Sequence, residues 1–332
     1  MYKVSIIMAI FNTEKYIERS FKSILNQTMD LEDIEVIMVD DFSTDNTRNI
    51  VREYEEKYPN FKAVYHEENS GGCAVPRNSG LKVATGEYVM FLDPDDEYYP
   101  TMCETMYNKI KNSDAEIVKC NHELIRPKNS KIDYQFDESI NELEINCKTD
   151  NPLISVSVCN AIHDRAFLKE KNIMFPILKN AEDMVFSTTE FLNANKIIYI
   201  KYVGYKYYTN SEVSHSMKPS KKNLDAVLAG YVKTKEIIEK SGRTEIYYPF
   251  FSGTCFSFFI RIMDYAGDKK EYFKQFYEFE KSLNCTLTFK YSWMNIVNKF
   301  IAKNHITMAV LAFEGMNLIR KTPIIKIYRK SL

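Results

Sequence analysis

Three carboxylates within four residues, Asp93, Asp95 and Asp96, directly follow an apolar run at residues 87–92. Like charges this close repel one another unless a cation or hydrogen-bond donors neutralise them. Carboxylate oxygens suit Mg²⁺ or Mn²⁺, which commonly keep coordination positions for substrate phosphates and water. The cluster therefore indicates a site for one of these two cations. The alternative is a solvated acidic loop or a helix start, where Asp is also favoured.

A second pair of carboxylates, Asp40 and Asp41, closes another apolar run at residues 34–39. A carboxylate at the end of a strand can accept a hydrogen bond from a nucleobase N–H or from a ribose hydroxyl. The same pair also suits a turn, because Asp side chains bond to nearby backbone groups. The sequence alone leaves both interpretations of Asp41 open.

A short loop with two glycines, Asn69 to Gly72, precedes a segment with helical character at about 73–84. Glycine lets the backbone approach a ligand closely. Arg77 follows one helical turn later, where its planar guanidinium can hold a phosphate or an aspartate. Taken alone, Arg77 fits a surface or structural arginine better than a ligand-binding one.

These polar groups follow segments that alternate between strand and helix patterns. Continuous apolar runs predict buried strands, and apolar residues at helical spacing predict helices. The expected strands are residues 4–10, 34–39, 61–65 and 87–92, and the expected helices include 16–25 and 73–84. This alternation predicts an α/β fold with a mostly parallel sheet and helices on both faces. Ligands of such sheets bind beyond the carboxyl ends of the strands, so residues 9–12, 40–43 and 93–96 predict one nucleotide-type site.

The composition of the whole chain narrows the class of protein. The 332 residues carry 44 Lys and Arg against 45 Asp and Glu, which argues against a protein built to bind nucleic acid. The seven cysteines are scattered and form no C-x-x-C pair, so they suggest neither a zinc site nor a disulfide framework. Free cysteines of this kind fit a protein of a reducing compartment. The N-terminus lacks the pattern of a signal peptide, and no apolar stretch is long enough to span a bilayer. We therefore expect a cytoplasmic protein.

The chain changes character near residue 218. Residues 120–150 read as irregular and acidic, 155–215 return to strand and helix patterns, and aromatic-rich helical patterns dominate from 219 onward. We expect a catalytic domain at 1–218 and a helical extension at 219–332. Dense aromatic residues between 247 and 259 favour core packing of this extension, with self-association into a homo-oligomer or acceptor binding as alternatives.

The last 17 residues, 316–332, carry five basic side chains and no acidic one, interleaved with isoleucines. An amphipathic basic segment of this kind can lie on an anionic membrane surface. We expect peripheral contact with the inner face of the membrane, and the alternative is a solvated helix end.

Several blocks, taken in order, resemble family 2 of the inverting GT-A glycosyltransferases. The blocks are VSIIMAIFN, EKYIERSFKSILNQT, VIMVDDFSTDNT and NSGGCAVPRNSGLKVATGEYVMFLDPDD. Further along, CNAIHDRAFLKEKNIMFP, AEDMVFSTTEFLNA and YKYYTN followed by SHS resemble the acceptor half of that domain, so the resemblance covers about residues 3–216. It implies a Rossmann-like GT-A domain that binds a nucleotide-diphosphate sugar, most often a UDP-sugar.

The resemblance also implies roles for individual residues. Asp41 would accept a hydrogen bond from the base, Asp93 would touch the ribose or the sugar, and Asp95 would bind the metal that bridges the diphosphate. His215 would belong to a loop that closes over the diphosphate. The complete nucleotide-sugar-binding set that the resemblance implies is Ala9, Asp41, Asn69, Arg77, Asp93, Pro94, Asp95, Asp96, His215 and Ser216.

Direct displacement with inversion needs another carboxylate, and the resemblance assigns this role to Asp183, with Glu182 beside it. As general base, Asp183 would take the proton from the acceptor hydroxyl that attacks the anomeric carbon, worth roughly 10²–10⁴-fold in rate. Glu182 would support Asp183 or contact the acceptor sugar. The alternative is that the two acids only begin a helix, where its dipole favours them.

Together these features predict a metal-dependent inverting glycosyltransferase. It would move a hexose or N-acetylhexosamine from a UDP-sugar to a hydroxyl of a surface glycan or lipid-linked acceptor. Two alternatives remain: a nucleotidyltransferase, which would release pyrophosphate, and a nucleotide-sugar-binding scaffold without turnover. The absence of G-x-G-x-x-G after the first strand argues against a redox Rossmann enzyme.

Overall fold

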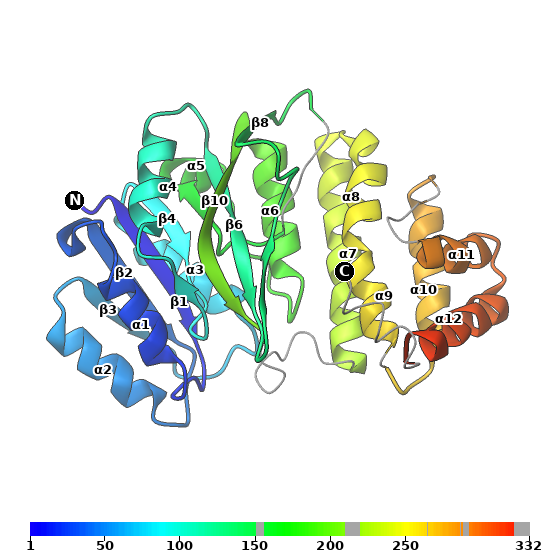
Figure 1. Ribbon diagram of the computed structural model, residues 1–332, viewed down its shortest axis with the longest axis horizontal. Helices are drawn as coiled ribbons and strands as arrows, with labels where there is room; N and C mark the ends of the chain where they lie inside the picture. The colour runs from blue at the N-terminus through cyan, green and yellow to red at the C-terminus, as the bar shows by residue number, and fades with distance from the viewer. Residues whose placement is uncertain (151–155, 210–219, 264, 286, 288–291, 322–332) are drawn as a thin grey trace. The chain divides into compact units, whose positions relative to one another are not determined.

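The computed structural model describes residues 1–150, 156–209, 220–263, 265–285, 287 and 292–321. The chain forms two compact units, Met1–Ser214 and His215–Leu332. The first unit contains the sheet and the second is helical (Figure 1). The predicted site residues that the structure describes all belong to the first unit.

A ten-stranded sheet forms the centre of the first unit. The strands are β1 Val4–Ile10, β2 Ile34–Asp40, β3 Phe61–Tyr65, β4 Tyr88–Phe91, β5 Glu97–Tyr98, β6 Ile117–Ile125, β7 Ser130–Asp133, β8 Glu142–Asn146, β9 Ala161–Asp164 and β10 Lys196–Tyr208. Their order is β3-β2-β1-β4-β9-β6-β10-β5, with β7 beside β6 and β8 beside β10. Parallel pairing joins β3, β2, β1 and β4, and also joins β6 to β10. The other pairs, which involve β5, β7, β8 and β9, are antiparallel.

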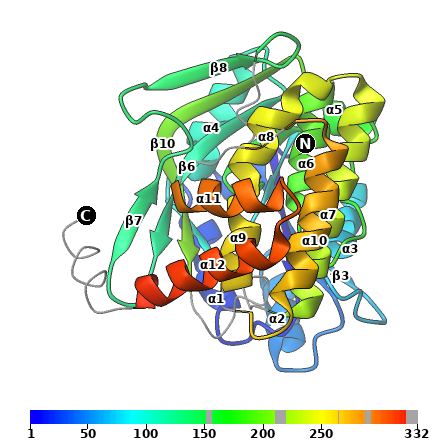
Figure 2. The ribbon, with the colours of Figure 1, turned by 90° about the vertical axis from the view of Figure 1, so that its right-hand side faces the viewer.

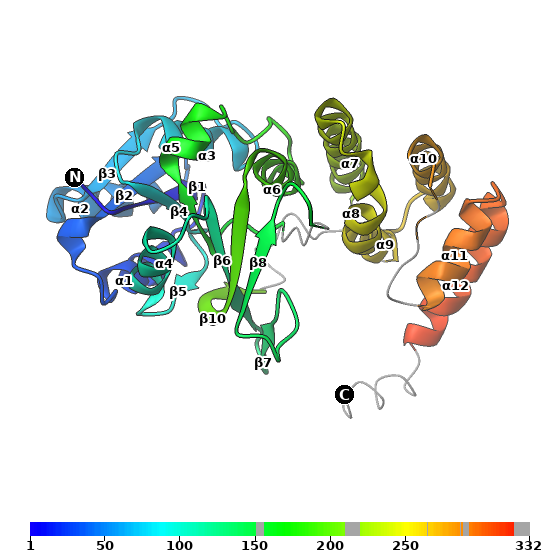
Figure 3. The same cartoon turned by 90° about the horizontal axis from the view of Figure 1, so that it is seen from above.

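Helices cover both faces of this sheet. They are α1 Ile17–Leu25, α2 Thr47–Lys57, α3 Ala74–Val83, α4 Met102–Lys111, α5 Arg165–Glu170 and α6 Glu182–Asn193. Helices α3 and α5 lie on one face, and α1 and α4 lie on the other (Figure 3). Strands β1, β2 and β4 are buried at every position, which is why they read as continuous apolar runs. Their parallel carboxyl ends meet at one edge, where the polar loops after each strand come together.

One stretch differs from the sequence prediction of an irregular segment. Residues 120–150 contain the end of β6 and the strands β7 and β8, which pair with β6 and β10. Most side chains of β7 and β8 are exposed or half-buried, so these strands lack the apolar pattern of a buried strand. Backbone pairing with neighbouring strands defines them instead.

The second unit is built from helices around aromatic side chains. Its helices are α7 Lys221–Ser241, α8 Tyr247–Thr254, α9 Phe256–Met263, α10 Lys269–Ser282, α11 Ser292–Ile301 and α12 Ile306–Lys321. Phe251, Phe258 and Phe276 are fully buried, and the ring centroids of Phe258 and Phe276 lie 5.6 Å apart. Helices α11 and α12 lie side by side (Figure 2). The described aromatic residues therefore form the core of this unit, as their density in the sequence favours.

The predicted contact of the C-terminal tail with a membrane stays a prediction. Residues 322–332, which hold most of the tail, lie outside the described part of the chain. Among the described helices, none combines the length and apolar character that a membrane span requires.

Candidate active site

The loop that follows β4 is held by α1 through its backbone. Ser20 donates from Oγ to the carbonyl oxygens of Pro94, at 2.9 Å, and Asp96, at 2.6 Å. Arg19 donates to the carbonyl oxygen of Asp95. Pro94, which the sequence places at the ligand, is buried within this loop and shapes its turn. Because three consecutive carbonyls are bound to α1, the loop presents its aspartate side chains in fixed directions.

Asp96 differs from the sequence prediction, because its side chain is a structural group. It is fully buried, and its two oxygens accept the Tyr205 hydroxyl at 2.6 Å and the Tyr208 backbone N–H at 2.7 Å. Burial, with the nearby charges of Asp95 and Asp93, raises the pKa of Asp96 well above its ordinary value. Asp96 therefore ties the loop to β10 and offers no exposed oxygen to a ligand.

Asp40 and Asp41 are enclosed in the same way. Asp40 is fully buried and accepts an arginine side chain of α2 at 2.7 Å. Asp41 pairs with His66 Nδ1 at 2.7 Å through Oδ1, and its Oδ2 accepts the Ser70 backbone N–H at 3.0 Å and the Ser70 hydroxyl at 2.8 Å. Three of its roughly four acceptor positions are thus occupied by the protein. One position remains for the base contact that the resemblance implies.

Other residues predicted to contact the nucleotide sugar are Asn69, Ala9, His215 and Ser216. Asn69 donates to the carbonyl oxygen of Asp41 at 3.0 Å, and its own Oδ1 accepts the Gly71 N–H at 2.9 Å. Asn69 therefore fastens its loop to the end of β2. Ala9 is buried in β1, with 8% of its surface exposed. His215 and Ser216 lie outside the described residues.

Asp93 and Asp95 differ from these enclosed groups, because both side chains remain partly exposed. Burial and the charge of Asp93 raise the pKa of Asp95 to about 6, against an opposing effect of Arg19. A cation beside Asp95 would relieve this repulsion, and oxygen ligands suit Mg²⁺ or Mn²⁺. Among the described residues, no three His, Cys, Asp or Glu side chains gather as a metal-binding group. The donors present fit a cation that takes one carboxylate from the protein and other ligands from phosphates and water.

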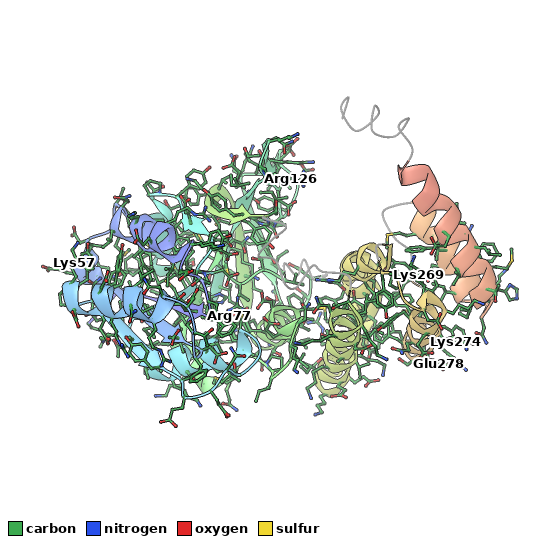
Figure 4. All side chains as sticks on the ribbon, turned by 90° about the horizontal axis from the view of Figure 1, so that it is seen from below. Lys57, Arg77, Arg126, Lys269, Lys274 and Glu278 are labelled. Atoms are coloured by element: carbon green, nitrogen blue, oxygen red, sulfur yellow. The ribbon has the colours of Figure 1, made fainter. Side chains whose placement is uncertain are left out.

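Arg77 joins the two acidic segments that the sequence singled out. Its Nη2 donates to Asp93 Oδ1 at 2.9 Å, and its Nη1 donates to Asp183 Oδ1 at 2.5 Å and lies 3.5 Å from Glu182 Oε1. The Arg77 side chain is 4% exposed and packs over the Phe175 ring, whereas Asp93 and Asp183 are 31% and 32% exposed. Figure 4 shows Arg77 inside the first unit, with Lys57 and Arg126 at its surface. The guanidinium therefore holds two aspartates from distant parts of the chain, each with a solvent-accessible side.

Asp183 lies in the first turn of α6, directly after Glu182. The helix N-terminus favours a negative charge at this position. Burial raises the pKa of Asp183 to about 7; Arg77 opposes this shift, and the charges of Glu182 and Asp93 add to it. A carboxylate that titrates near neutrality is matched to general-base work. We call Asp93, Asp95 and Asp183 the open group, and Asp40, Asp41 and Asp96 the closed group.

Sequence reasoning missed Arg19 and His66. Arg19 looks like a surface residue in the sequence, because it lies on the polar side of an amphipathic helix. His66 links Asp41 to Ser79, whose Oγ lies 3.0 Å from its Nε2. Its partners lie 25 and 13 residues away in the chain, so only the fold shows the connection. The one available signal is its place directly after β3, at the same edge as the site.

Comparison with known proteins identifies the family. The family model described as glycosyl transferase family 2 matches residues 5–170. A poly(ribitol-phosphate) beta-glucosyltransferase of Bacillus spizizenii is 33% identical over 218 residues, which cover 64% of this chain and 33% of that protein. TarP of Staphylococcus aureus, a poly(ribitol-phosphate) beta-N-acetylglucosaminyltransferase, is 36% identical over 63% of this chain and 62% of its own. This chain thus spans about a third of the Bacillus relative and less than two thirds of TarP.

Another relative matches along most of its length. The glycosyltransferase YibD of Escherichia coli, itself uncharacterised, is 30% identical over 73% of this chain and 71% of its own. The crystal structure of S. aureus TarS residues 1–349 with UDP-GlcNAc superposes with a TM-score of 0.75 at 24% identity, covering 95% of this chain and 92% of that one. This likeness confirms the predicted α/β fold with a helical C-terminal region. The family model and the relatives together show that the chain belongs to glycosyl transferase family 2.

Proposed function

We propose that this chain transfers a hexose or N-acetylhexosamine from a UDP-sugar to a hydroxyl of a teichoic-acid-type polymer, with inversion at the anomeric carbon. The names of its relatives support the acceptor class, because several act on poly(ribitol phosphate). The TarS complexes with UDP-GlcNAc and with UDP support the donor class. Family membership supports a glycosyltransferase over a nucleotidyltransferase.

The observation that carries the proposed mechanism is the double contact of Arg77. Arg77 binds Asp93 and Asp183 together, which supports our assignment of the donor-side carboxylate and the base-side carboxylate to one site. Arg77 engages Oδ1 of Asp183, so we assign proton transfer to Oδ2. This oxygen would take the proton of the acceptor hydroxyl as the acceptor oxygen bonds to the anomeric carbon. The bond from that carbon to the diphosphate breaks in the same step, and UDP leaves.

The metal requirement is part of the same proposal. Asp95 would hold Mn²⁺ or Mg²⁺, and the bound cation would stabilise the negative charge of the departing diphosphate. Arg77 already contacts Asp93 and Asp183, so we assign the diphosphate charge to the cation rather than to this arginine. Asp93 has one oxygen bound to Arg77, and we assign its other oxygen to a sugar or ribose hydroxyl of the donor.

The proposed function is tested with purified chain, a panel of UDP-sugars, poly(ribitol phosphate), and Mn²⁺ or Mg²⁺. We expect one or two UDP-sugars to give metal-dependent release of UDP and labelling of the polymer. A matched control is Arg126→Ala, which removes a surface arginine far from Arg77 in the first unit (Figure 4) and should behave as wild type. Release of pyrophosphate would contradict the proposal, as would no polymer labelling with any donor in the panel.

A further inference from the structure

Two residues near the site adopt a backbone conformation that their side chains disfavour. Among the described residues, six that are not glycine have positive φ: Asn12, Phe42, Asn172, Ala181, Asn284 and Asn304. Asparagine tolerates this left-handed region, whereas a bulky residue there is a genuine outlier. Phe42, with φ of 66°, directly follows Asp41, and Ala181, with φ of 67°, directly precedes Glu182. Both exceptions therefore adjoin carboxylates of the candidate site.

Phe42 gains little burial in return for its strained backbone. Its side chain is 41% exposed, at the edge formed by the carboxyl ends of β1 and β2. Its ring lies over the Arg48 guanidinium, with Cζ 5.8 Å from the ring centroid. A glycine at this position would adopt the same backbone without strain. The fold alone therefore gives no reason for an aromatic ring here.

The ring is nevertheless placed on a rigid base. Arg48 is fixed by the fully buried Asp40 at 2.7 Å and by the carbonyl oxygen of His66 at 3.1 Å. The Tyr65 ring is also within reach of this guanidinium, with the centroid 5.3 Å from Cζ. A guanidinium held by several partners orients the ring that packs on it. Phe42 is thus a preorganised aromatic surface with an exposed side.

The turn that carries Phe42 is also pinned to the end of β1. The Asn12 backbone N–H donates to Ser43 Oγ at 3.0 Å, and Asn12 Oδ1 accepts the Thr44 N–H at 2.8 Å. Phe11, next to Asn12, is 44% exposed. Strained residues persist where surrounding contacts over-determine them, and they concentrate at ligand sites.

We propose that Phe42 is a donor-binding residue whose ring stacks on the planar base of the donor nucleotide. Asp41, one residue earlier, retains one acceptor position for an N–H of that base, so stacking and hydrogen bonding would come from consecutive residues. Aromatic rings stack on any base, so Phe42 supplies affinity while Asp41 selects the base edge. This inference rests on the proposed use of a UDP-sugar.

The test combines stability with binding in Phe42→Gly. Relief of the left-handed strain should raise the melting temperature of the protein, while loss of the ring should weaken UDP binding about tenfold by calorimetry. Binding of magnesium pyrophosphate, which has no base, should stay unchanged. Phe42→Tyr should retain the UDP affinity. Asn172→Gly, at a left-handed position outside the site, should leave UDP affinity unchanged.

The outcomes separate this inference from the proposed function. If wild type binds UDP and Phe42→Gly binds it equally well, the stacking role is wrong and the proposed function stands. If Phe42→Gly loses pyrophosphate and UDP binding in parallel, the residue shapes the loop and does not stack. If Phe42→Gly does not fold, Phe42→Ser takes its place in the test. Loss of UDP affinity with intact pyrophosphate binding in Phe42→Ser would support stacking, and unchanged UDP affinity would refute it. If wild type binds pyrophosphate but shows no preference for UDP, both proposals fail.

Discussion

The closed and open groups of aspartates lie at one edge of one sheet, yet their surroundings are opposite. Each aspartate of the closed group is at least 97% buried as a residue, and its carboxylate is bound by several protein donors. Asp93 and Asp183 in the open group keep about a third of their side chains exposed and share a single buried arginine. The difference supports the proposed division of work. Asp40 and Asp96 fix the loops, Asp41 fixes its loop and would bind the base with its one remaining acceptor position, and the open aspartates would bind substrate and metal.

Arg77→Ala should have a large effect on both activity and stability, because it removes the connection within the open group. Asp93 and Asp183 would lose their shared cation, and the Phe175 ring would lose one of its packing partners. We expect transfer activity to fall by at least about 10²-fold and the free energy of unfolding to fall by about 2 kcal/mol. The stability effect is kept moderate by water reaching the two carboxylates. Denaturant unfolding measures the change in stability, and initial rates measure the change in activity. A variant with normal activity would show that transfer does not require the contacts of Arg77 with Asp93 and Asp183.

Asp96→Ala and Asp95→Ala should have different effects: the first should lower stability, and the second should abolish metal-dependent UDP binding. Asp96→Ala leaves the Tyr205 hydroxyl and the Tyr208 N–H without their acceptor, so we expect a loss of about 2–3 kcal/mol in stability. Asp95→Ala removes one of two repelling charges and should leave stability unchanged or slightly higher, while abolishing metal-dependent UDP binding. Thermal unfolding and calorimetry with Mn²⁺ and UDP provide the readouts. Equal losses of stability in the two variants would contradict the distinction between a structural Asp96 and a ligand-binding Asp95.

The pH dependence of the reaction should follow Asp183. A general base works only when deprotonated, and the folded protein raises the pKa of this carboxyl to about 7. We therefore expect kcat/KM to increase with pH through a midpoint near 7 and then to level off. Glu182→Gln removes a neighbouring charge that raises this pKa, so the midpoint should move to lower pH. If the midpoint does not move in Glu182→Gln, the charge of Glu182 does not influence the pKa of Asp183.

The smallest expected effect is a gain in stability from Ala181→Gly. Ala181 has φ of 67° at the N-cap of α6, where glycine fits without strain. We expect the free energy of unfolding to rise by about 0.5–1 kcal/mol. Ala84→Gly is the matched control, because Ala84 has an ordinary φ of −59° and should become less stable. A loss of stability in Ala181→Gly would show that its backbone is unstrained.

The sequence predicts the parallel part of the sheet well for a simple physical reason. Strands β1, β2 and β4 are covered on both faces, so their apolar runs are uninterrupted. Strands β7 and β8 carry no such pattern, because their side chains mostly face solvent. The ends of these apolar runs therefore predict where the polar loops of the site lie. The pairing of β7 with β6 and of β8 with β10 is visible only in the structure.

The individual aspartates could not be sorted into groups from the sequence. Asp95 and Asp96 are adjacent and chemically identical, and one is buried against β10 while the other stays partly exposed. Their separation depends on Tyr205 and Tyr208, more than a hundred residues later in the chain. The same is true of Arg77, whose second aspartate lies 106 residues away.

The proposed mechanism depends most on Asp183, which would take the proton from the acceptor hydroxyl, and Asp183→Asn tests this role directly. The amide keeps the size of the side chain and an oxygen for Arg77, so fold and UDP-sugar affinity should be retained. We predict that the rate of transfer to polymer falls roughly 10²–10⁴-fold while the dissociation constant for UDP-sugar changes by less than about threefold. A folded Asp183→Asn variant that transfers sugar at the wild-type rate would contradict the account.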